Sequence, residues 1–314
     1  MMNLAKIVYL VLFIIEFILG FCCNSFIGLV NCINCIKSKR MTSSDLIITS
    51  LALSRICLLW VPIVNILQLL YPNLYEKKIL GIIVIIWIFI NHLSTGLVTG
   101  LSVHYCLKIA RYSHSAFLWL KWRVSCVVIW ILLGSVLFSF FSVAPVIKEL
   151  IVSFSSRQMK FIANCTENIT KSYAFIFSAV WMVIPFVIIL CSSLLLILSL
   201  RRHTQQMNNS ITGSRDPNTE AHLKAARIIV SFLFLYILYF VAFFILIFSD
   251  YLPDYNLALM IGEMITTAYP SAHSFILILS NNKLKQAFLR MFQIRCGTWG
   301  DLVTLCLTGK SGKQ

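Results

Sequence analysis

Charged residues are scarce in this sequence of 314 residues. They make up 12% of it, and the acidic ones are rarest, with 11 Asp and Glu against 26 Lys and Arg. Soluble domains carry about 25% charged and about 45–50% apolar residues, whereas this chain is 59% apolar with a mean hydropathy of +0.88. The shortage of charge excludes a large soluble domain, and it indicates a protein whose solvent is lipid.

Catalytic and metal-binding patterns are also missing. The sequence contains no G-x-S-x-G, no H-E-x-x-H, no phosphate-binding glycine loop and no membrane-embedded pair of acids spaced for acid-base catalysis. Its eleven Cys lie mostly inside apolar runs, where a small polarizable side chain packs well. We therefore expect no enzyme activity, no cofactor, no metal ion and no disulfide framework.

Long apolar runs dominate what is present, and a spanning helix needs about 20 such residues. Seven runs cover approximately residues 7–36, 46–70, 80–107, 124–147, 173–200, 225–249 and 257–281. They predict an all-α bundle of seven transmembrane helices, the first of them a span and not a removed leader. We expect residues 1–281 to form this domain, and residues 282–314 to form a cytoplasmic amphipathic helix and tail.

The distribution of the basic residues predicts the orientation. If the N-terminus is outside, the segments in the cytosol hold eighteen Lys and Arg and the outer segments hold seven, which is the bias that membrane proteins show. The +15 net charge is explained in this way without a nucleic-acid partner. Asn164 and Asn168 both begin N-x-T acceptors in the outer loop between the fourth and fifth runs, where glycosylation takes place. The prediction is a multi-pass protein with an extracellular N-terminus and a cytoplasmic C-terminus.

Three ionisable residues inside the runs need a partner or a cavity, because a charge in lipid is costly. They are Glu16, Arg55 and Glu263. Asn24 lies two helical turns from Glu16 on nearly the same face, with Gly20 midway, where a neighbouring helix can approach closely. We expect a network of Asn24, Arg55 and a polar residue of the seventh run. It either holds helices together or takes part in a conformational switch, and the sequence leaves both roles open.

Aromatic and amide residues suggest a small-molecule pocket. Trp87 and Asn91 are one turn apart in the outer part of the third run, where they are suited to form a pocket wall. The sixth run is rich in aromatic residues, which pack helices together in most such cases, although a subset facing the bundle would form a cavity floor. Pro185 and Pro270 lie inside the fifth and seventh runs, and each frees a backbone carbonyl and kinks its helix.

Six strings, in the expected order, make the chain resemble the bitter taste (type 2 taste) receptors over most of its length. The first is discontinuous and consists of Glu16, Gly20 and NSFI (24–27). The others are LALSRICL (51–58), HYCLKIARYS (104–113), PFVIILCSSLLLILSLRRHTQQM (185–207), HLKAARIIVSFLFLYILYF (222–240) and YPSAHSFILILSNNKLKQ (269–286). The rhodopsin-like Asp-Arg-Tyr and Asn-Pro-x-x-Tyr patterns are absent. The sequence departs from the taste-receptor pattern at His104, where Phe is usual, and at Asn282, where Pro is common.

The resemblance implies a plasma-membrane receptor that binds diverse bitter small molecules and activates a heterotrimeric G protein of the gustducin type. It implies a ligand site among the third, fifth, sixth and seventh spans, a switch in the helix core and a G-protein-facing surface. The ligand-binding residues would be Trp87, Asn91, Tyr236, Tyr239 and Glu263; the switch residues Glu16, Asn24, Arg55, Tyr105, Pro185, His273 and Ser274; and the G-protein-facing residues Lys108, Arg111, His203 and Lys224. A vomeronasal type 1 chemoreceptor and a small membrane carrier are the alternatives.

Overall fold

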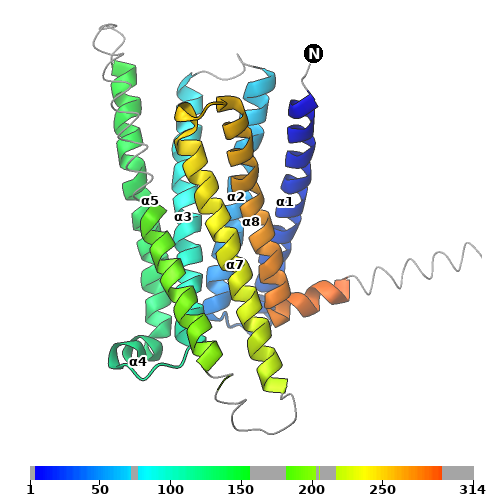
Figure 1. The fold of residues 1–314 in the computed structure, drawn as a ribbon, viewed down its shortest axis with the longest axis vertical. Coiled ribbons are helices and arrows are strands. Elements are labelled where there is room, and N and C mark those ends of the chain that lie inside the picture. Colours follow the sequence, from blue (N-terminus) through cyan, green and yellow to red (C-terminus); the bar gives the residue numbers. More distant parts are fainter. Residues whose placement is uncertain (1–3, 72–76, 156–181, 203–204, 206–216, 292–314) are drawn as a thin grey trace, which may run out of the picture.

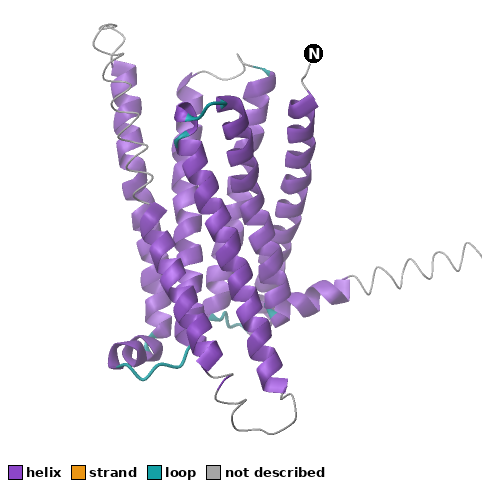
Figure 2. Cartoon of the chain, in the orientation of Figure 1, coloured by secondary structure: helices purple, strands orange, loops and turns teal. Residues whose placement is uncertain are grey.

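A computed structural model of the chain describes residues 4–71, 77–155, 182–202, 205 and 217–291. These residues form helices joined by short connections, and none of them lies in a β-strand (Figure 2). The prediction of an all-α helical bundle is confirmed.

Seven long helices form the bundle in the described part of the chain, and Figure 1 shows how they lie side by side. They are α1 (Leu4–Ser38), α2 (Ser43–Leu70), α3 (Lys77–Ile109), α5 (Val124–Ser155), the helix Met182–Arg202, α7 (Pro217–Ile247) and α8 (Tyr255–Ser280). Two short helices join them, α4 (Ser115–Trp122) and the 3-10 turn η2 (Ser249–Tyr251). We call the end of the bundle that carries the N-terminus the upper end and the opposite end the lower end, as they appear in Figure 1.

Six of the seven long helices are long and apolar enough to cross a membrane. The seventh, α8, is 26 residues long, or about 39 Å at 1.5 Å per residue, which exceeds a hydrocarbon core of about 30 Å. It is less apolar because it carries polar residues such as Glu263, Thr266 and His273 that face the inside of the bundle.

The helices extend beyond the apolar runs that predicted them. α5 continues to Ser155, past the run that ends at 147, and α7 begins at Pro217, before the run that begins at 225. Hydropathy detects only the part of a helix that lies in lipid, whereas the hydrogen-bonded backbone continues into water. The connection at 108–123, predicted only as a segment in the cytosol, contains α4, whose Trp122 is exposed.

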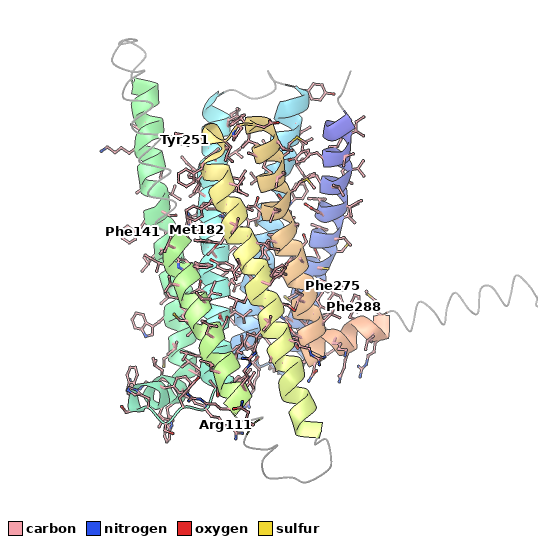
Figure 3. All side chains as sticks on the ribbon, in the orientation of Figure 1. Arg111, Phe141, Met182, Tyr251, Phe275 and Phe288 are labelled. Atoms are coloured by element: carbon pink, nitrogen blue, oxygen red, sulfur yellow. The ribbon has the colours of Figure 1, made fainter. Side chains whose placement is uncertain are left out.

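Large apolar side chains cover the outer surface of the bundle. Trp130 and Phe141 of α5 are among them, and Figure 3 shows Phe141 projecting away from the neighbouring helices. Lipid solvates such a surface, so the helices gain their contacts from close packing of small residues instead of from hydrophobic burial. A Cβ atom added at Gly100 of α3 would collide with Ile131 of α5, and one added at Gly20 of α1 would collide with Ser271 of α8. The close approach expected at Gly20 is therefore present.

The segment after α8 is helical at residues 282–291 and turns away from the bundle at its lower end (Figure 1). Lys283 forms an ion pair with Asp45 near the start of α2, with 2.8 Å between Nζ and Oδ2. Leu284 is fully buried, and the ring of Phe288 packs edge-on against Phe26 of α1 at 5.8 Å. These contacts fasten the segment to α1 and α2. Residues 292–314 lie outside the described part of the chain.

Substituting Gly20 tests the contact between α1 and α8. We expect Gly20→Val to destabilise the protein by about 1–3 kcal/mol, because the added atoms would displace Ser271 and Leu59. Gly28→Val is the matched control, since nothing lies within 4 Å of an added Cβ there. Thermal unfolding of the purified protein in detergent measures both, and an equal loss in the two variants would contradict the close approach.

Candidate ligand-binding site

A cavity of about 270 Å³ opens inside the bundle. Its wall comes from α2, α3, α7 and α8, and most of it is apolar. The lining residues with polar atoms or aromatic rings are Trp87, Asn91, Tyr239, Phe243, Glu263, Thr266 and Thr267. A mostly apolar hollow with a few convergent polar groups is the usual form of a small-molecule site.

Four of the five residues predicted to contact a ligand line this cavity together: Trp87 and Asn91 on α3, Tyr239 on α7 and Glu263 on α8. The Tyr239 hydroxyl donates to Asn91 Oδ1 at 3.0 Å, which closes the cavity floor between α3 and α7. The fifth, Tyr236, lines a different cavity nearer the lower end.

The cavity wall also differs from the predicted one in the helices that build it. None of its lining residues comes from the helix Met182–Arg202, which was expected to contribute, whereas Leu58, Leu59 and Val61 of α2 line it. These α2 residues are aliphatic and lie in a continuous apolar stretch, so nothing in the sequence distinguishes them from lipid-facing residues.

Glu263 carries the negative charge of the cavity. Tyr9 of α1 donates its hydroxyl to Glu263 Oε2 at 2.7 Å, so the carboxylate is held from outside the cavity by a helix that does not line it. Thr266, one turn further along α8, turns its hydroxyl back to the carbonyl of Gly262. Tyr9 was not predicted, because a lone tyrosine near the start of a span is typical of the interfacial aromatic belt.

A chain of hydrogen bonds crosses the middle of the bundle below the cavity. Arg55 of α2, which has no exposed surface, donates from Nη1 to the hydroxyl of Ser274 at 2.9 Å. Ser274 in turn donates to Asn24 Oδ1 at 2.7 Å, and Asn24 Nδ2 donates to the carbonyl of Gly20 at 2.8 Å. The expected contact among Asn24, Arg55 and the seventh run is present, and Ser274 provides its third member.

Glu16 lies near these hydrogen bonds, but its side chain takes no part in them. Its backbone carbonyl accepts a hydrogen bond from Ser271 at 3.3 Å, whereas its buried Oε2 has no hydrogen-bond partner among the described residues. Spacing alone suggested a role beside Asn24, but two helical turns leave the carboxylate nearer the upper end.

Stacked aromatic rings connect the upper cavity to Arg55. The Tyr239 ring stacks on Tyr269 of α8 with centroids 4.6 Å apart, and Arg55 Cζ lies 5.7 Å from the Tyr269 centroid. His273 follows one turn below Tyr269, at 5.6 Å, and contacts Phe232 of α7 at 4.6 Å. The aromatic residues of α7 that face inward therefore serve two purposes, since they pack the helix and also form the cavity floor.

A second, smaller cavity of about 40 Å³ lies on the far side of this aromatic layer. It is lined by α3, the helix Met182–Arg202, α7 and α8, and its polar or aromatic lining residues are Ser102, Tyr105, Ser193, Phe232, Tyr236, Tyr269 and His273. Tyr105 and His273, predicted as switch residues, meet here. Pro185 lies in the helix Met182–Arg202 but lines neither cavity, whereas Pro270 lines the upper one.

At the lower end, Lys108 at the end of α3 and Arg111 just after it are exposed (Figure 3). The backbone N–H of Arg111 donates to Ser199 Oγ at 2.9 Å, which joins this connection to the helix Met182–Arg202. Lys224 belongs to the lower part of α7. His203 and the glycosylation acceptors Asn164 and Asn168 lie outside the described residues.

Cys32 and Cys35 on α1 have the C-x-x-C spacing found in some metal sites. Within the described ranges no group of three or more His, Cys, Asp or Glu side chains is placed to hold a metal ion, and both thiols are free. The arrangement around the upper cavity is suited to binding an organic molecule.

Seven long helices around an internal cavity, with a polar network beneath it, form a bundle of the seven-transmembrane receptor type. The family model for the taste receptor protein (TAS2R) matches residues 1–296. Taste receptor type 2 member 3 of Homo sapiens is 47% identical over 95% of this chain and 96% of its own length, and taste receptor type 2 member 7 of Pongo pygmaeus is 44% identical over 88% and 89%. The chain belongs to the type 2 taste receptor family. It is a multi-pass membrane receptor, and the vomeronasal and carrier alternatives are set aside.

Replacing Ser274 tests the central hydrogen-bond chain. We expect Ser274→Ala to lower the free energy of unfolding by about 1.5–3 kcal/mol, because it leaves Arg55 Nη1 and Asn24 Oδ1 buried without their partner. Ser280→Ala is the control, since the Ser280 hydroxyl bonds to the Leu277 carbonyl of its own helix, and its cost should stay within about 0.5 kcal/mol. Equal losses of unfolding free energy in the two variants, measured by denaturant titration, would show that the hydrogen bonds of Ser274 contribute nothing to stability.

Proposed function

We propose that this taste receptor detects bitter small molecules, with a preference for cationic, alkaloid-like ones, and activates a heterotrimeric G protein of the gustducin type. The observation that supports the proposal best is the upper cavity, in which Trp87, Asn91, Tyr239 and Glu263 meet. We assign these four residues to the ligand site, with Tyr236 acting from the layer beneath.

The chemistry of the cavity favours an ammonium group attached to an apolar body. Apolar residues of all four helices form most of the wall, so burial of apolar ligand surface supplies most of the affinity. Glu263 places one negative charge against this wall, where the low dielectric strengthens its attraction for a cation. The Trp87 ring would add a cation-π face. The amide oxygen of Asn91 accepts from Tyr239, and its N–H groups would orient a ligand oxygen.

Activation would follow from the contact between the cavity floor and the helix core. An agonist shifts the receptor toward the active arrangement by no more than its difference in affinity for the two states. Tyr239 contacts the cavity above and stacks on Tyr269, which faces Arg55. A ligand that moves Tyr239 would thus alter the packing of the Arg55–Ser274–Asn24 chain.

Bending would take place where a helix lacks a backbone hydrogen bond. Pro270 leaves the carbonyl of Thr266, four residues earlier, without its helical donor, and both residues line the cavity. Pro185 would allow the same in the helix Met182–Arg202. The movement would open the lower end of the bundle. We assign G-protein contact to the residues beside this opening, Lys108, Arg111, His203 and Lys224. Tyr105 and His273 would act in the switch between the two ends.

This mechanism needs the upper end outside the cell and the lower end in the cytosol of a plasma membrane. The excess of Lys and Arg in the lower segments supports that orientation. The amphipathic segment 282–291 would then lie along the inner leaflet, attached to α2 by the ion pair of Lys283 with Asp45.

The charge of Glu263 gives a test of both the ligand class and the site. In cells that express the receptor with a gustducin-type G protein, calcium mobilisation should respond to members of a bitter compound panel. We expect Glu263→Gln to raise the half-maximal concentration of cationic agonists about tenfold or more, because a charge-assisted contact is lost. Neutral agonists should change much less.

Tyr9→Phe is the matched control for this test. It removes the hydrogen bond to Glu263 and keeps the negative charge, so the preference for cationic agonists should survive. An equal loss for cationic and neutral agonists in Glu263→Gln would refute a charge role. A receptor that answers no compound of the panel while reaching the cell surface would count against the proposed ligand class.

The orientation has a separate test. If the N-terminus is outside, peptide-N-glycosidase should increase the gel mobility of the receptor by removing glycans from Asn164 and Asn168. The double variant Asn164→Gln/Asn168→Gln should migrate at the deglycosylated position before any treatment. Asn208 provides the control, because it begins an N-x-S acceptor in the loop between the fifth and sixth runs, which this orientation places in the cytosol. Asn208→Gln should therefore leave the shift intact. A mobility shift that persists in the double variant would reject these acceptors.

A further inference from the structure

The guanidinium of Arg55 is only partly satisfied. Its Nη1 donates to Ser274, whereas its Nε and Nη2 are buried and make no hydrogen bond to any described residue. The ring of Tyr269 lies 5.7 Å from Arg55 Cζ. Arginine keeps its proton under all ordinary conditions, so a full positive charge with unused donors lies at the centre of the bundle.

The carboxylates of the described helices lie too far along their axes to neutralise this charge. Asp45 precedes Arg55 by ten residues on α2, about 15 Å at 1.5 Å per residue, and it pairs with Lys283. Glu263 precedes Ser274 by eleven residues on α8, about 16 Å, and accepts from Tyr9. Glu16 precedes Asn24 by about 12 Å on α1. A buried cation without a counter-charge is strongly unfavourable.

Other unsatisfied groups gather around the same point. The hydroxyls of Tyr236 and Tyr269 and the Nδ1 of His273 are buried and have no hydrogen-bond partner among the residues described. These three side chains are each less than 9% exposed, and all three line the cavity of about 40 Å³. The rings form a connected group, with Tyr269 centred 6.0 Å from Tyr236 and 5.6 Å from His273.

Several hydrogen-bond donors are therefore buried close together at this place. Arginine N–H groups can only donate, and a tyrosine hydroxyl and a histidine ring nitrogen can each donate one hydrogen. A water molecule would satisfy some of these groups and leave the charge unchanged, whereas a small anion accepts from several donors and neutralises the charge. The volume of about 40 Å³ exceeds the roughly 10–15 Å³ that one water needs, so it has room for a single-atom anion.

We propose that the receptor binds one halide ion, chloride under physiological conditions, in the small cavity between Tyr236, Tyr269 and His273, as the counter-ion of Arg55. Arg55 does not line this cavity itself, but its Cζ lies 5.7 Å from the ring of Tyr269, which does. The ion compensates the charge of the guanidinium across this ring and joins α7 to α8. The proposal does not depend on the nature of the agonist or of the G protein.

Exchange of the anion on the purified receptor tests the site directly. In detergent or nanodiscs without agonist, gluconate is replaced by chloride at constant ionic strength and pH while the Tm is measured. We expect the Tm to rise saturably by about 2–4 °C, because an ion that binds only the folded state stabilises it by mass action. Bromide should replace chloride, since it has the same charge and shape.

Two tyrosine variants locate the effect. Tyr236→Phe removes one donor hydroxyl and keeps the ring, so the chloride concentration for half of the Tm rise should increase about tenfold. Tyr251→Phe, at a residue that is 78% exposed at the upper end, should leave that concentration unchanged. Arg55→Gln should abolish the dependence of the Tm on chloride if the variant folds. If it does not fold, Tyr236→Phe alone decides whether the ion binds in this cavity.

Equal Tm values in gluconate and chloride would overturn the proposal and leave water as the only occupant. A chloride effect of the same half-maximal concentration in Tyr236→Phe and in the unmodified receptor would also overturn it, because the ion would then bind elsewhere. Failure of the bitter-agonist assay would leave both results untouched, so the two proposals fail independently.

Discussion

The hydrogen bond from Arg55 to Ser274 is the contact on which the architecture depends. A fully buried guanidinium cannot lose its proton, so the surrounding helices must bring acceptors to it. Ser274 of α8 accepts from Arg55 and donates to Asn24 of α1, and one hydroxyl thereby fixes three helices around a charge. That geometry requires α8 to lie against α1, and Gly20 permits it by leaving room for Ser271. The cavity above is then enclosed by helices whose spacing is set from below.

The layer of stacked tyrosines gives this framework two compartments. Tyr239 belongs to the upper cavity, with Trp87, Asn91 and Glu263, and Tyr269 belongs to the lower one, with Tyr105 and His273. Their rings stack at 4.6 Å, so neither compartment can change shape at this layer without the other. A receptor needs such a connection, because a signal crosses the membrane only if ligand contacts at one end favour a different packing at the other.

Much of this organisation could be predicted from the sequence because it obeys one-dimensional rules. Apolar runs define the helices, and the cost of a charge in lipid singles out Arg55 and Glu263. The partners of these charges were harder to predict. Ser274 was named only through the family resemblance, and Tyr9 is an ordinary span residue until the helices are placed side by side. The same limit explains three differences from the prediction. Residues of α2 line the upper cavity, the helix Met182–Arg202 does not, and Tyr236 lies below the cavity floor. Which face of an apolar helix turns inward is a property of the packed bundle.

A double-mutant cycle between Asn24→Ala and Ser274→Ala tests the central claim most directly. The free energies of unfolding of the two single variants, the double variant and the unmodified receptor give the coupling energy between the two side chains. If the hydroxyl joins Asn24 to the buried guanidinium, the single losses should overlap, with a coupling of about 1–2 kcal/mol. Losses that add within about 0.3–0.5 kcal/mol would mean that the two side chains act independently, and the account of a framework built on Arg55 would be wrong.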